Sequence, residues 1–205
     1  MNISAYTSEK ILADVKQLQY LYKLKEVIRY DQNRQETDST ESVAEHLYGM
    51  MLLADYFLPL EDSKGELNRT RIYEMILYHD IDEIETGDVL GYTKTEADRA
   101  QELEAMKRTL SNAPEHMQSL MRERVEEYEA RETPEAKFAK AIDKIEPLVQ
   151  IFNAKGKEIL HTNKTTAEQS LRIKTPYIQD FPFIKAFNDT VHEALLKGGY
   201  YWIGE

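Results

Sequence analysis

The sequence of 205 residues contains no cysteine. Disulfide bonds and thiolate metal sites are therefore excluded, and a reducing compartment is the simplest expectation. The N-terminal stretch MNISAYTSEK has no apolar segment of the kind found in signal peptides, and no apolar run is long enough for a membrane span. We therefore expect a cytoplasmic protein without a membrane partner.

A surplus of positive charge is also lacking. The chain has 37 acidic and 26 basic residues, which gives a net charge of −11 at pH 7. Nucleic acids bind cationic surfaces, so no nucleic-acid partner is expected. A small phosphorylated ligand is compatible with this charge if a metal ion or local arginine and lysine side chains overcome the negative field.

The sequence shows no β-type alternation of any length, no internal repeat and no low-complexity tract. Apolar residues recur at helical spacing along most of the chain, which predicts an all-α protein with one domain over residues 1–205. Residues 29–42 are polar and should form a loop, and 153–163 should be looser. The predicted helices cover about 11–28, 43–59, 69–82, 96–110, 115–130, 134–152, 166–173 and 184–197.

Two isolated residues of the predicted helices have side chains that could bind a metal ion or take part in a reaction. His46 lies on an inward-facing stripe, in a helix preceded by an S-x-x-E capping box. A single inward histidine is more often a hydrogen-bonded core residue than a metal ligand. Asp143, in AKFAKAIDKIE, has an equally ordinary explanation, which is an ion pair with Lys140 or Lys144.

The stretch YHDIDEIETGD, residues 78–88, concentrates ionisable side chains. Glu83 is four residues after His79 and three after Asp80, so a continuous helix would place all three on one side. An inward imidazole with two carboxylates is costly unless these groups are paired or bind a metal ion. Asp82 and Glu85 are expected on the solvated face. A His-Asp dipeptide alone is a weak signal.

The combination is more informative than its parts. Three helices with apolar stripes would bring two imidazoles and two carboxylates inward, from His46, His79, Asp80 and Asp143. Such a mixed nitrogen and oxygen set suits a divalent transition metal. Four protein ligands leave room for water, as in catalytic metal sites. Without thiolates, the expected chemistry is hydrolytic or Lewis-acid.

This H…HD…D pattern resembles the HD-domain phosphohydrolase superfamily. The segments ESVAEH, YHDIDEIETGD and AKFAKAIDKIE look most like its small 5′-deoxynucleotidase branch. The resemblance implies a single-domain HD-type helical bundle, with a metal-site core at about residues 11–153 and a C-terminal helical extension at about 165–205. It also implies an enzyme that removes the 5′-phosphate from (deoxy)nucleoside monophosphates with one divalent metal, either Mn, Co, Ni, Fe or Zn.

The resemblance carries roles to individual positions. The metal ligands of the family correspond to His46, His79, Asp80 and Asp143. Glu83 and Asp88 match catalytic acidic residues beside the metal, which position water and substrate. Either of them can be the general base or acid. Gly87 is expected to permit the turn that brings Asp88 back toward the site.

The branch also binds the nucleotide through residues at the end of its first helix. Arg29 is the match for the phosphate-binding arginine, and Tyr30 for an aromatic residue near the sugar. The span from Arg29 to His46 is longer than in the branch, so Arg34 is an alternative for the phosphate. The tryptophan of the branch is absent here, so strict selectivity for 2′-deoxy substrates is not implied.

Other hypotheses remain. An HD-type site could act on another small phosphate ester, a nucleotide pyrophosphate or a cyclic nucleotide, or the chain could be a non-catalytic helical regulatory protein with a vestigial metal site. Three further histidines, His116, His161 and His192, lack ligand-type neighbours and are interpreted as surface or core residues. The C-terminal YYWIG is interpreted as a docking tail of a homodimer rather than core cover, because exposed aromatic tails need a partner.

Overall fold

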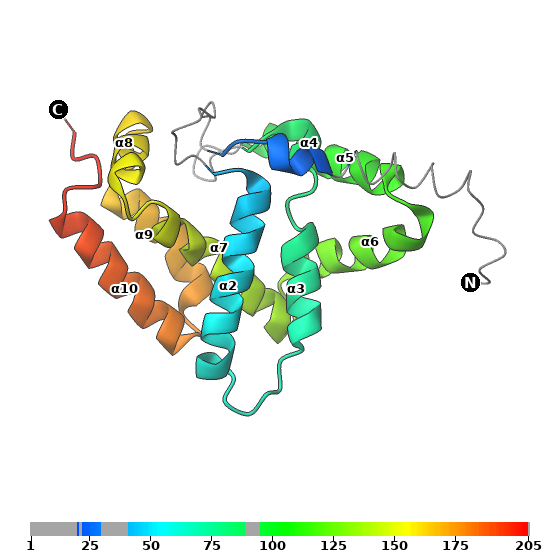
Figure 1. Cartoon of the computed structure of the whole chain (residues 1–205), viewed down its shortest axis with the longest axis horizontal. Coiled ribbons are helices and arrows are strands. Elements are labelled where there is room, and N and C mark those ends of the chain that lie inside the picture. Colours follow the sequence, from blue (N-terminus) through cyan, green and yellow to red (C-terminus); the bar gives the residue numbers. More distant parts are fainter. Residues whose placement is uncertain (1–19, 21, 30–40, 89–94, 205) are drawn as a thin grey trace.

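The computed structural model describes residues 20, 22–29, 41–88 and 95–204. This part of the chain is helical (Figure 1), and apart from one isolated bridge it contains no β-structure. The all-α prediction is therefore confirmed. Most of the first predicted helix, residues 11–28, lies outside the described residues; within them, Tyr22–Glu26 forms a 3-10 helix, η2.

The α-helices begin and end close to most of the predicted positions. Their bounds are α2 Val43–Glu61, α3 Arg69–Tyr78, α4 Glu83–Thr86, α5 Glu96–Asn112, α6 Glu115–Ala130, α7 Pro134–Gln150, α8 Ala154–Thr162, α9 Ala167–Ile178 and α10 Pro182–Lys197.

Local capping explains several of these starts. Ser42 accepts a hydrogen bond from the Glu45 amide while the Glu45 side chain accepts from the Ser42 amide, which is the predicted capping box of α2. Thr133 caps α7 by accepting from the Ala136 amide, and Pro134 occupies the first turn, where its missing N–H costs nothing. Side chains adjacent in sequence therefore determine these helix starts.

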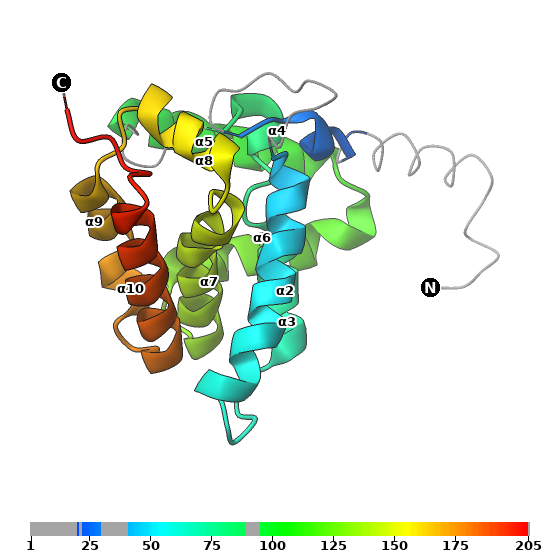
Figure 2. The ribbon, with the colours of Figure 1, turned by 60° about the vertical axis from the view of Figure 1, so that its left-hand side comes forward.

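Helix α7 forms the centre of the domain. It contacts α2, α3, α6, α9 and α10, which surround it in the views of Figure 1 and Figure 2. A helix buried on several sides needs small or apolar residues around its circumference. The fully buried ones in α7 are Ala136, Phe138, Ala139, Ala141, Ile142, Ile145 and Leu148.

Several helix boundaries differ from the prediction. Helix α3 ends at Tyr78 rather than near Asp82, and a separate short helix, α4, begins at Glu83. Residues 154–162, which were expected to be looser, form the regular helix α8, because Asn153 caps it and Ile159 and Leu160 are buried. Tertiary burial here outweighs the weak local pattern.

Two prolines do not end their helices where expected. Helix α2 continues past Pro59 to Glu61, and the Asp62 amide still donates to Leu58. Helix α9 runs through Pro176 to the buried Ile178. In both cases the proline lies near the C-terminal end, so few helical hydrogen bonds follow it and side-chain burial holds the last turn.

An antiparallel bridge between Ile28 and Ser42 joins the described N-terminal segment to the start of α2. The Arg29 amide donates to the Glu41 carbonyl at 2.9 Å, and the Val43 amide donates to the Val27 carbonyl at 3.0 Å. This bridge places Arg29 beside the N-terminus of α2, one helical turn from His46.

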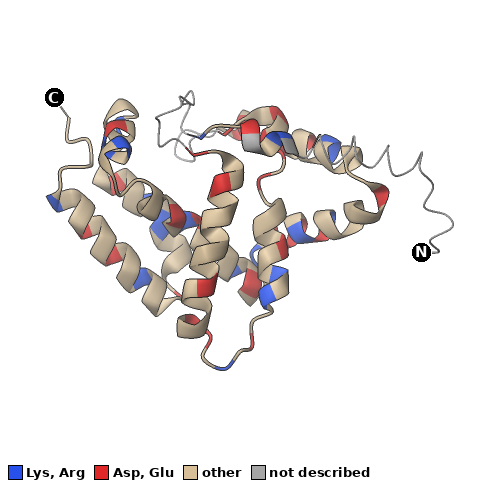
Figure 3. Cartoon of the chain, in the orientation of Figure 1, with Lys and Arg blue, Asp and Glu red and all other residues tan. Residues whose placement is uncertain are grey.

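The acidic residues are distributed over most of the helices rather than gathered on one element (Figure 3). In the described ranges, every helix is too short or too polar to cross a lipid bilayer. The C-terminal tail differs from its interpretation as a free docking segment, since Tyr201 is only 2% exposed and belongs to the main core, whereas Ile203 is 91% exposed.

The central position of α7 leads to a stability prediction. Phe138 is fully buried and meets the Phe181 ring edge-on, with centroids 5.6 Å apart. Phe138→Ala should lower the free energy of unfolding by about 3–5 kcal/mol in urea denaturation, because it leaves a cavity. Val149→Ala, at a position of the same helix that is 49% exposed, should change it by less than about 0.5 kcal/mol. Equal effects at the two positions would contradict the central role of α7.

Candidate functional site

The candidate site lies where α2, the end of α3 and α7 meet. His46, His79 and Asp143 are all buried, and each offers one ligand atom within 4.8 Å of the others. Asp80 is next to this group, with its Oδ2 3.0 Å from His79 Nε2. The four residues proposed as ligands from the sequence are thus brought together from three separate elements.

Both histidine rings are oriented by a hydrogen bond at Nδ1. His79 Nδ1 donates to the Ile76 carbonyl at 2.9 Å, and a carbonyl can only accept, so the lone pair of the neutral ring is on Nε2. His46 Nδ1 donates to Glu146 Oε2 at 2.7 Å. In both residues Nε2 is therefore directed to the common centre, as in histidines that bind metals.

The two Nε2 atoms test whether a cation fits. Both are buried, and neither has a hydrogen-bond partner among the described residues. Asp80 Oδ2 and Asp143 Oδ1 lie 3.0 and 3.4 Å from them, but these contacts lack hydrogen-bond geometry. Buried polar atoms without partners are rare in proteins. Two such nitrogens, converging on two carboxylates, fit a divalent cation.

The charge balance around Asp143 supports a carboxylate that is ionised. Burial alone raises the pKa of Asp143, but the cations of Lys144 and Lys140 hold it well below its usual range. Lys144 Nζ lies 2.9 Å from Asp143 Oδ2, Lys140 Nζ lies 3.4 Å away, and the buried Tyr128 hydroxyl donates to the same oxygen at 2.8 Å. The ion pairs considered from the sequence therefore coexist with the histidine cluster.

His46 and Asp80 are shifted toward their charged forms by their neighbours. Burial and the charge of Arg29 lower the pKa of His46, but the carboxylates of Asp143 and Glu146 outweigh them and raise it to about 9. Burial raises the pKa of Asp80, and His79 reverses this and holds it well below the usual value. A metal ion at this centre would take the place of the proton on His46.

The acidic residues after His79 take up different environments. Glu83 is buried at the start of α4, and its Oε2 has no hydrogen-bond partner among the described residues. Burial, followed by the charges of Asp80 and Asp88, raises its pKa well above the usual value. Gly87 has a φ of +70°, which glycine adopts without strain, and the chain turns so that Asp88 lines the adjacent pocket.

The prediction that Asp82 lies on the solvated face is wrong. Asp82 is only 8% exposed. The expected helix ends at Tyr78, so helical spacing no longer determines which way residue 82 faces. Glu85 does lie at the surface, where it accepts hydrogen bonds of 2.7 Å from the Tyr20 hydroxyl and from Arg108 Nε.

A carboxylate that the sequence analysis missed joins two parts of the site. Glu146 accepts from His46 Nδ1 at 2.7 Å and, on the same oxygen, from Arg29 Nη1 at 3.4 Å. Arg29 Nη1 also donates to Glu41 at 2.7 Å. Burial raises the pKa of Glu41 to about 7 against the effect of Arg29. The spacing of Glu146, three residues after Asp143 on a helix, was the available signal.

Helix α2 leaves space for this carboxylate. A Cβ atom at Gly49 would lie 2.6 Å from Glu146 Oε1, closer than Cβ atoms approach non-bonded atoms in proteins. Gly49 is three residues after His46, on the same side of the helix. The glycine therefore permits Glu146 to reach the His46 ring.

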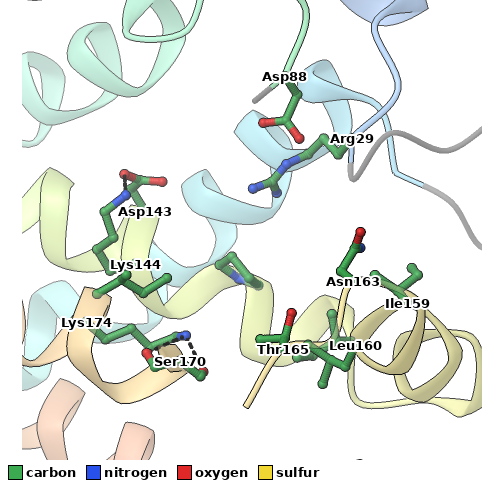
Figure 4. A pocket seen from close by; sticks show the side chains of 13 residues that line it. Arg29, Asp88, Asp143, Lys144, Ile159, Leu160, Asn163, Thr165, Ser170 and Lys174 are labelled. Atoms are coloured by element: carbon green, nitrogen blue, oxygen red, sulfur yellow. Dashed lines mark hydrogen bonds and ion pairs between the residues drawn. The ribbon is translucent and has the colours of Figure 1, made fainter. Parts of the chain in front are cut away.

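Beside the histidine cluster, a pocket of about 130 Å³ extends toward α8 and α9 (Figure 4). Arg29, Asp88 and Asp143 line its end near the cluster. Tyr30 and Arg34, the other proposed substrate-binding residues, lie outside the described residues. The pocket lining comprises Arg29, Asp88, Asp143, Lys144, Pro147, Ile151, Ile159, Leu160, Asn163, Thr165, Ser170, Ile173 and Lys174.

The three other histidines are in the environments expected for them. His116 and His161 are exposed, and His161 Nε2 lies 3.3 Å from the Gly199 carbonyl. His192 is buried, with its Nδ1 2.7 Å from the Tyr201 hydroxyl. Two of these histidines thus lie at the surface and the third in the core.

A family model described as HD domain matches residues 21–185. A 5′-deoxynucleotidase from Bos taurus is 33% identical over 136 residues, which are 65% of this chain and 63% of that protein. One from Schizosaccharomyces pombe is 31% identical over 127 residues, covering 58% and 61%. The chain thus spans less than two thirds of the length of these relatives.

A solved structure also resembles the chain. The crystal structure of a predicted metal-dependent phosphohydrolase from Magnetospirillum magnetotacticum MS-1 matches it with a TM-score of 0.78 at 24% identity, covering 94% of this chain and 95% of that one. This likeness supports the fold, a single HD-type helical domain.

The contact between Gly49 and Glu146 yields a prediction for the candidate metal centre. Gly49→Ala should displace Glu146 from His46 and weaken metal binding about 10–100-fold, the usual cost of losing a partner of a ligating histidine. Because alanine favours helices over glycine by about 1 kcal/mol, the thermal midpoint should not fall. Calorimetric titration with divalent metals, alongside thermal melting, measures both.

Glu146→Gln provides the parallel variant, since it keeps the size of the side chain and removes its charge. Its metal affinity should fall as well. Wild-type metal affinity in both variants would show that Glu146 does not orient His46.

Proposed function

This chain belongs to the HD domain family, and from that premise we propose that it is a metal-dependent phosphohydrolase that removes the 5′-phosphate from (deoxy)nucleoside monophosphates. The observation that carries the proposal is the convergence of two buried, unpartnered Nε2 atoms with the carboxylates of Asp80 and Asp143. The 5′-deoxynucleotidases that align at about one third identity support the nucleotide as substrate.

The proposed ligands of one divalent ion are His46, His79, Asp80 and Asp143. Two imidazoles and two carboxylates suit Mn, Co, Ni, Fe or Zn. When bound, such an ion lowers the pKa of water and offsets the charge on phosphate oxygens. The chain contributes the orientation of the ligands, since Ile76 and Glu146 fix the two rings through Nδ1.

Arg29 is the proposed phosphate-binding residue. Its guanidinium lines the pocket near Asp143, and the carboxylates of Glu41 and Glu146 hold it on one edge. A guanidinium offers five N–H donors in a planar fork that matches the oxygens of a phosphate. A charge-assisted contact of this kind would orient the phosphorus for attack. Arg34 stays the alternative for this role.

Glu83 is the proposed proton acceptor and Asp88 the proposed contact on the leaving-group side. The raised pKa of Glu83 makes its carboxylate more basic than that of an exposed glutamate. Its unpartnered Oε2 leaves one oxygen able to accept a proton or to orient water. Asp88 lines the pocket near Arg29 (Figure 4), where it could hold a ribose hydroxyl or the leaving oxygen.

We also propose that the chain forms a homodimer. An apolar stripe on α2 supports this, since residues four apart on one face are all exposed: Tyr48, Leu52, Tyr56 and Leu60. No nucleic-acid partner is proposed, because the net charge is −11.

The competing hypothesis keeps the same site but changes the substrate to another small phosphate ester, a nucleotide pyrophosphate or a cyclic nucleotide.

The decisive experiment is a phosphate-release assay with a panel of nucleoside monophosphates, cyclic nucleotides and p-nitrophenyl phosphate, each with several divalent metals. Turnover of 5′-monophosphates but not of cyclic nucleotides is expected.

Asp80→Ala should abolish both metal retention and turnover, while the circular dichroism spectrum stays that of a helical protein. Asp180→Ala, at an exposed aspartate, is the matched control and should retain both. A wild-type protein with neither bound metal nor turnover would instead indicate a vestigial site.

A second variant tests the role of Glu83. Glu83→Gln should lower kcat about 10²–10⁴-fold, the usual contribution of a general base, while metal content stays unchanged. Glu83 must be deprotonated to accept a proton, so the activity of the wild type should fall as the pH falls through the raised pKa of Glu83. This acid limb should be missing from the pH profile of the variant. If the kcat of the variant is within a few-fold of the wild-type value and its pH profile is the same, Glu83 has no role in the mechanism.

A further inference from the structure

One side of the pocket, next to Lys144, holds a buried lysine that the proposed mechanism does not use (Figure 4). Lys174, on α9, is only 5% exposed. Its Nζ donates to the Ser170 hydroxyl at 2.7 Å and to the Ser170 carbonyl at 3.1 Å. Ser170 is itself 4% exposed. Figure 4 shows the Lys174 side chain reaching into the pocket beside Ser170.

This lysine has hydrogen bonds but no counter-charge. Among the described residues, no carboxylate lies within ion-pair distance of Lys174 Nζ. Burial, followed by the charge of Lys144, lowers the pKa of Lys174 to about 7. A buried ammonium without an anion is costly unless something else in its surroundings accepts its remaining N–H. Ser170 accepts two of its three donors.

A second buried donor lines the opposite side of this pocket (Figure 4). Asn163 Nδ2 has no hydrogen-bond partner among the described residues. Two donors left over in one pocket, from α9 and from the end of α8, indicate that the ligand brings hydrogen-bond acceptors to this pocket.

Much of the remaining pocket lining is apolar, and it comprises Pro147, Ile151, Ile159, Leu160 and Ile173. Lys144 lies beside Lys174 (Figure 4), but its Nζ is paired with Asp143 Oδ2 at 2.9 Å. Along α7 the pocket runs from Asp143 to Ile151, two helical turns or about 12 Å. A phosphate at the cluster would therefore leave room for a sugar and a flat ring along these walls. Apolar walls suit a flat ring, and the charge of Lys144 is already balanced by Asp143, which together favour a nucleobase over a second anionic group.

We propose that Lys174 and Ser170 select the base of the substrate, by donating to a ring carbonyl at position 4 of a pyrimidine or position 6 of a purine. The proposal rests on the nucleotide phosphohydrolase function and adds the substrate class. Uracil, thymine, guanine and hypoxanthine carry an acceptor oxygen there, whereas cytosine and adenine carry an amino group, which is a donor. An amino group facing the Lys174 donor would leave both groups unpaired in a buried site. Binding of cytosine and adenine would therefore be strongly disfavoured.

Matched substrate pairs test this proposal. The 5′-monophosphates of deoxyuridine and deoxycytidine differ at position 4, and those of deoxyinosine and deoxyadenosine at position 6. The wild type should favour the carbonyl member of each pair about tenfold or more in kcat/KM. Lys174→Met should bring both ratios to within about twofold. It should leave turnover of 2-deoxyribose 5-phosphate, which has no base, unchanged.

Lys185→Met is the control for removing a lysine, since that side chain is 51% exposed on α10, and it should retain the wild-type ratios. If Lys174→Met does not fold by circular dichroism, Ser170→Ala removes the partner hydroxyl alone and should reduce both ratios at least threefold. If the kcat/KM ratios of the wild type are near one, or if they are unchanged in a folded Lys174→Met or Ser170→Ala variant, the base selection alone is overturned. Turnover of none of the monophosphates by the wild type would overturn the proposed function and this inference with it.

Discussion

The site depends on one buried carboxylate. Glu146 accepts from His46 Nδ1 and from Arg29 Nη1 on the same oxygen, so it fixes a proposed metal ligand and the proposed phosphate-binding residue relative to each other. Its helix, α7, packs against α2, α3, α6, α9 and α10, which makes the support rigid. Gly49 on α2 leaves space for its second oxygen. Glu146, three residues after Asp143, thus connects the central helix to the positions of His46 and Arg29.

Charge compensation explains how so many ionisable groups tolerate burial. Asp143 faces Lys144 and Lys140, Glu146 faces Arg29, and Asp80 Oδ2 lies 3.0 Å from His79 Nε2. Glu83 is different, because burial and neighbouring acids raise its pKa. Within the same low-dielectric surroundings, the neighbouring charges lower the pKa of Asp143 and Asp80 and raise that of Glu83. That contrast separates proposed ligands from the proposed proton acceptor.

The sequence was informative where neighbours along one helix decide the outcome. The capping box at Ser42 and the inward stripe of α2 placed His46 correctly, and Thr133 with Pro134 marked the start of α7. It failed where contacts from distant segments decide. Helix α3 ends at Tyr78, so Asp82 turns inward, and α8 is stabilised by burial that its own sequence does not reveal. Glu146 and Lys174 were missed because isolated charged residues on helices are usually solvated.

The sequence by itself determined the all-α class, the absence of thiolate chemistry and the chain positions of the histidines and carboxylates, because composition and helical periodicity are local properties. Tertiary structure alone decided which of those groups share a centre, which nitrogen of each histidine faces it, and which lysine is buried without a counter-charge. Those outcomes depend on the approach of α2, α3, α7 and α9, and interactions between segments far apart in the chain leave little trace in the local pattern of one sequence.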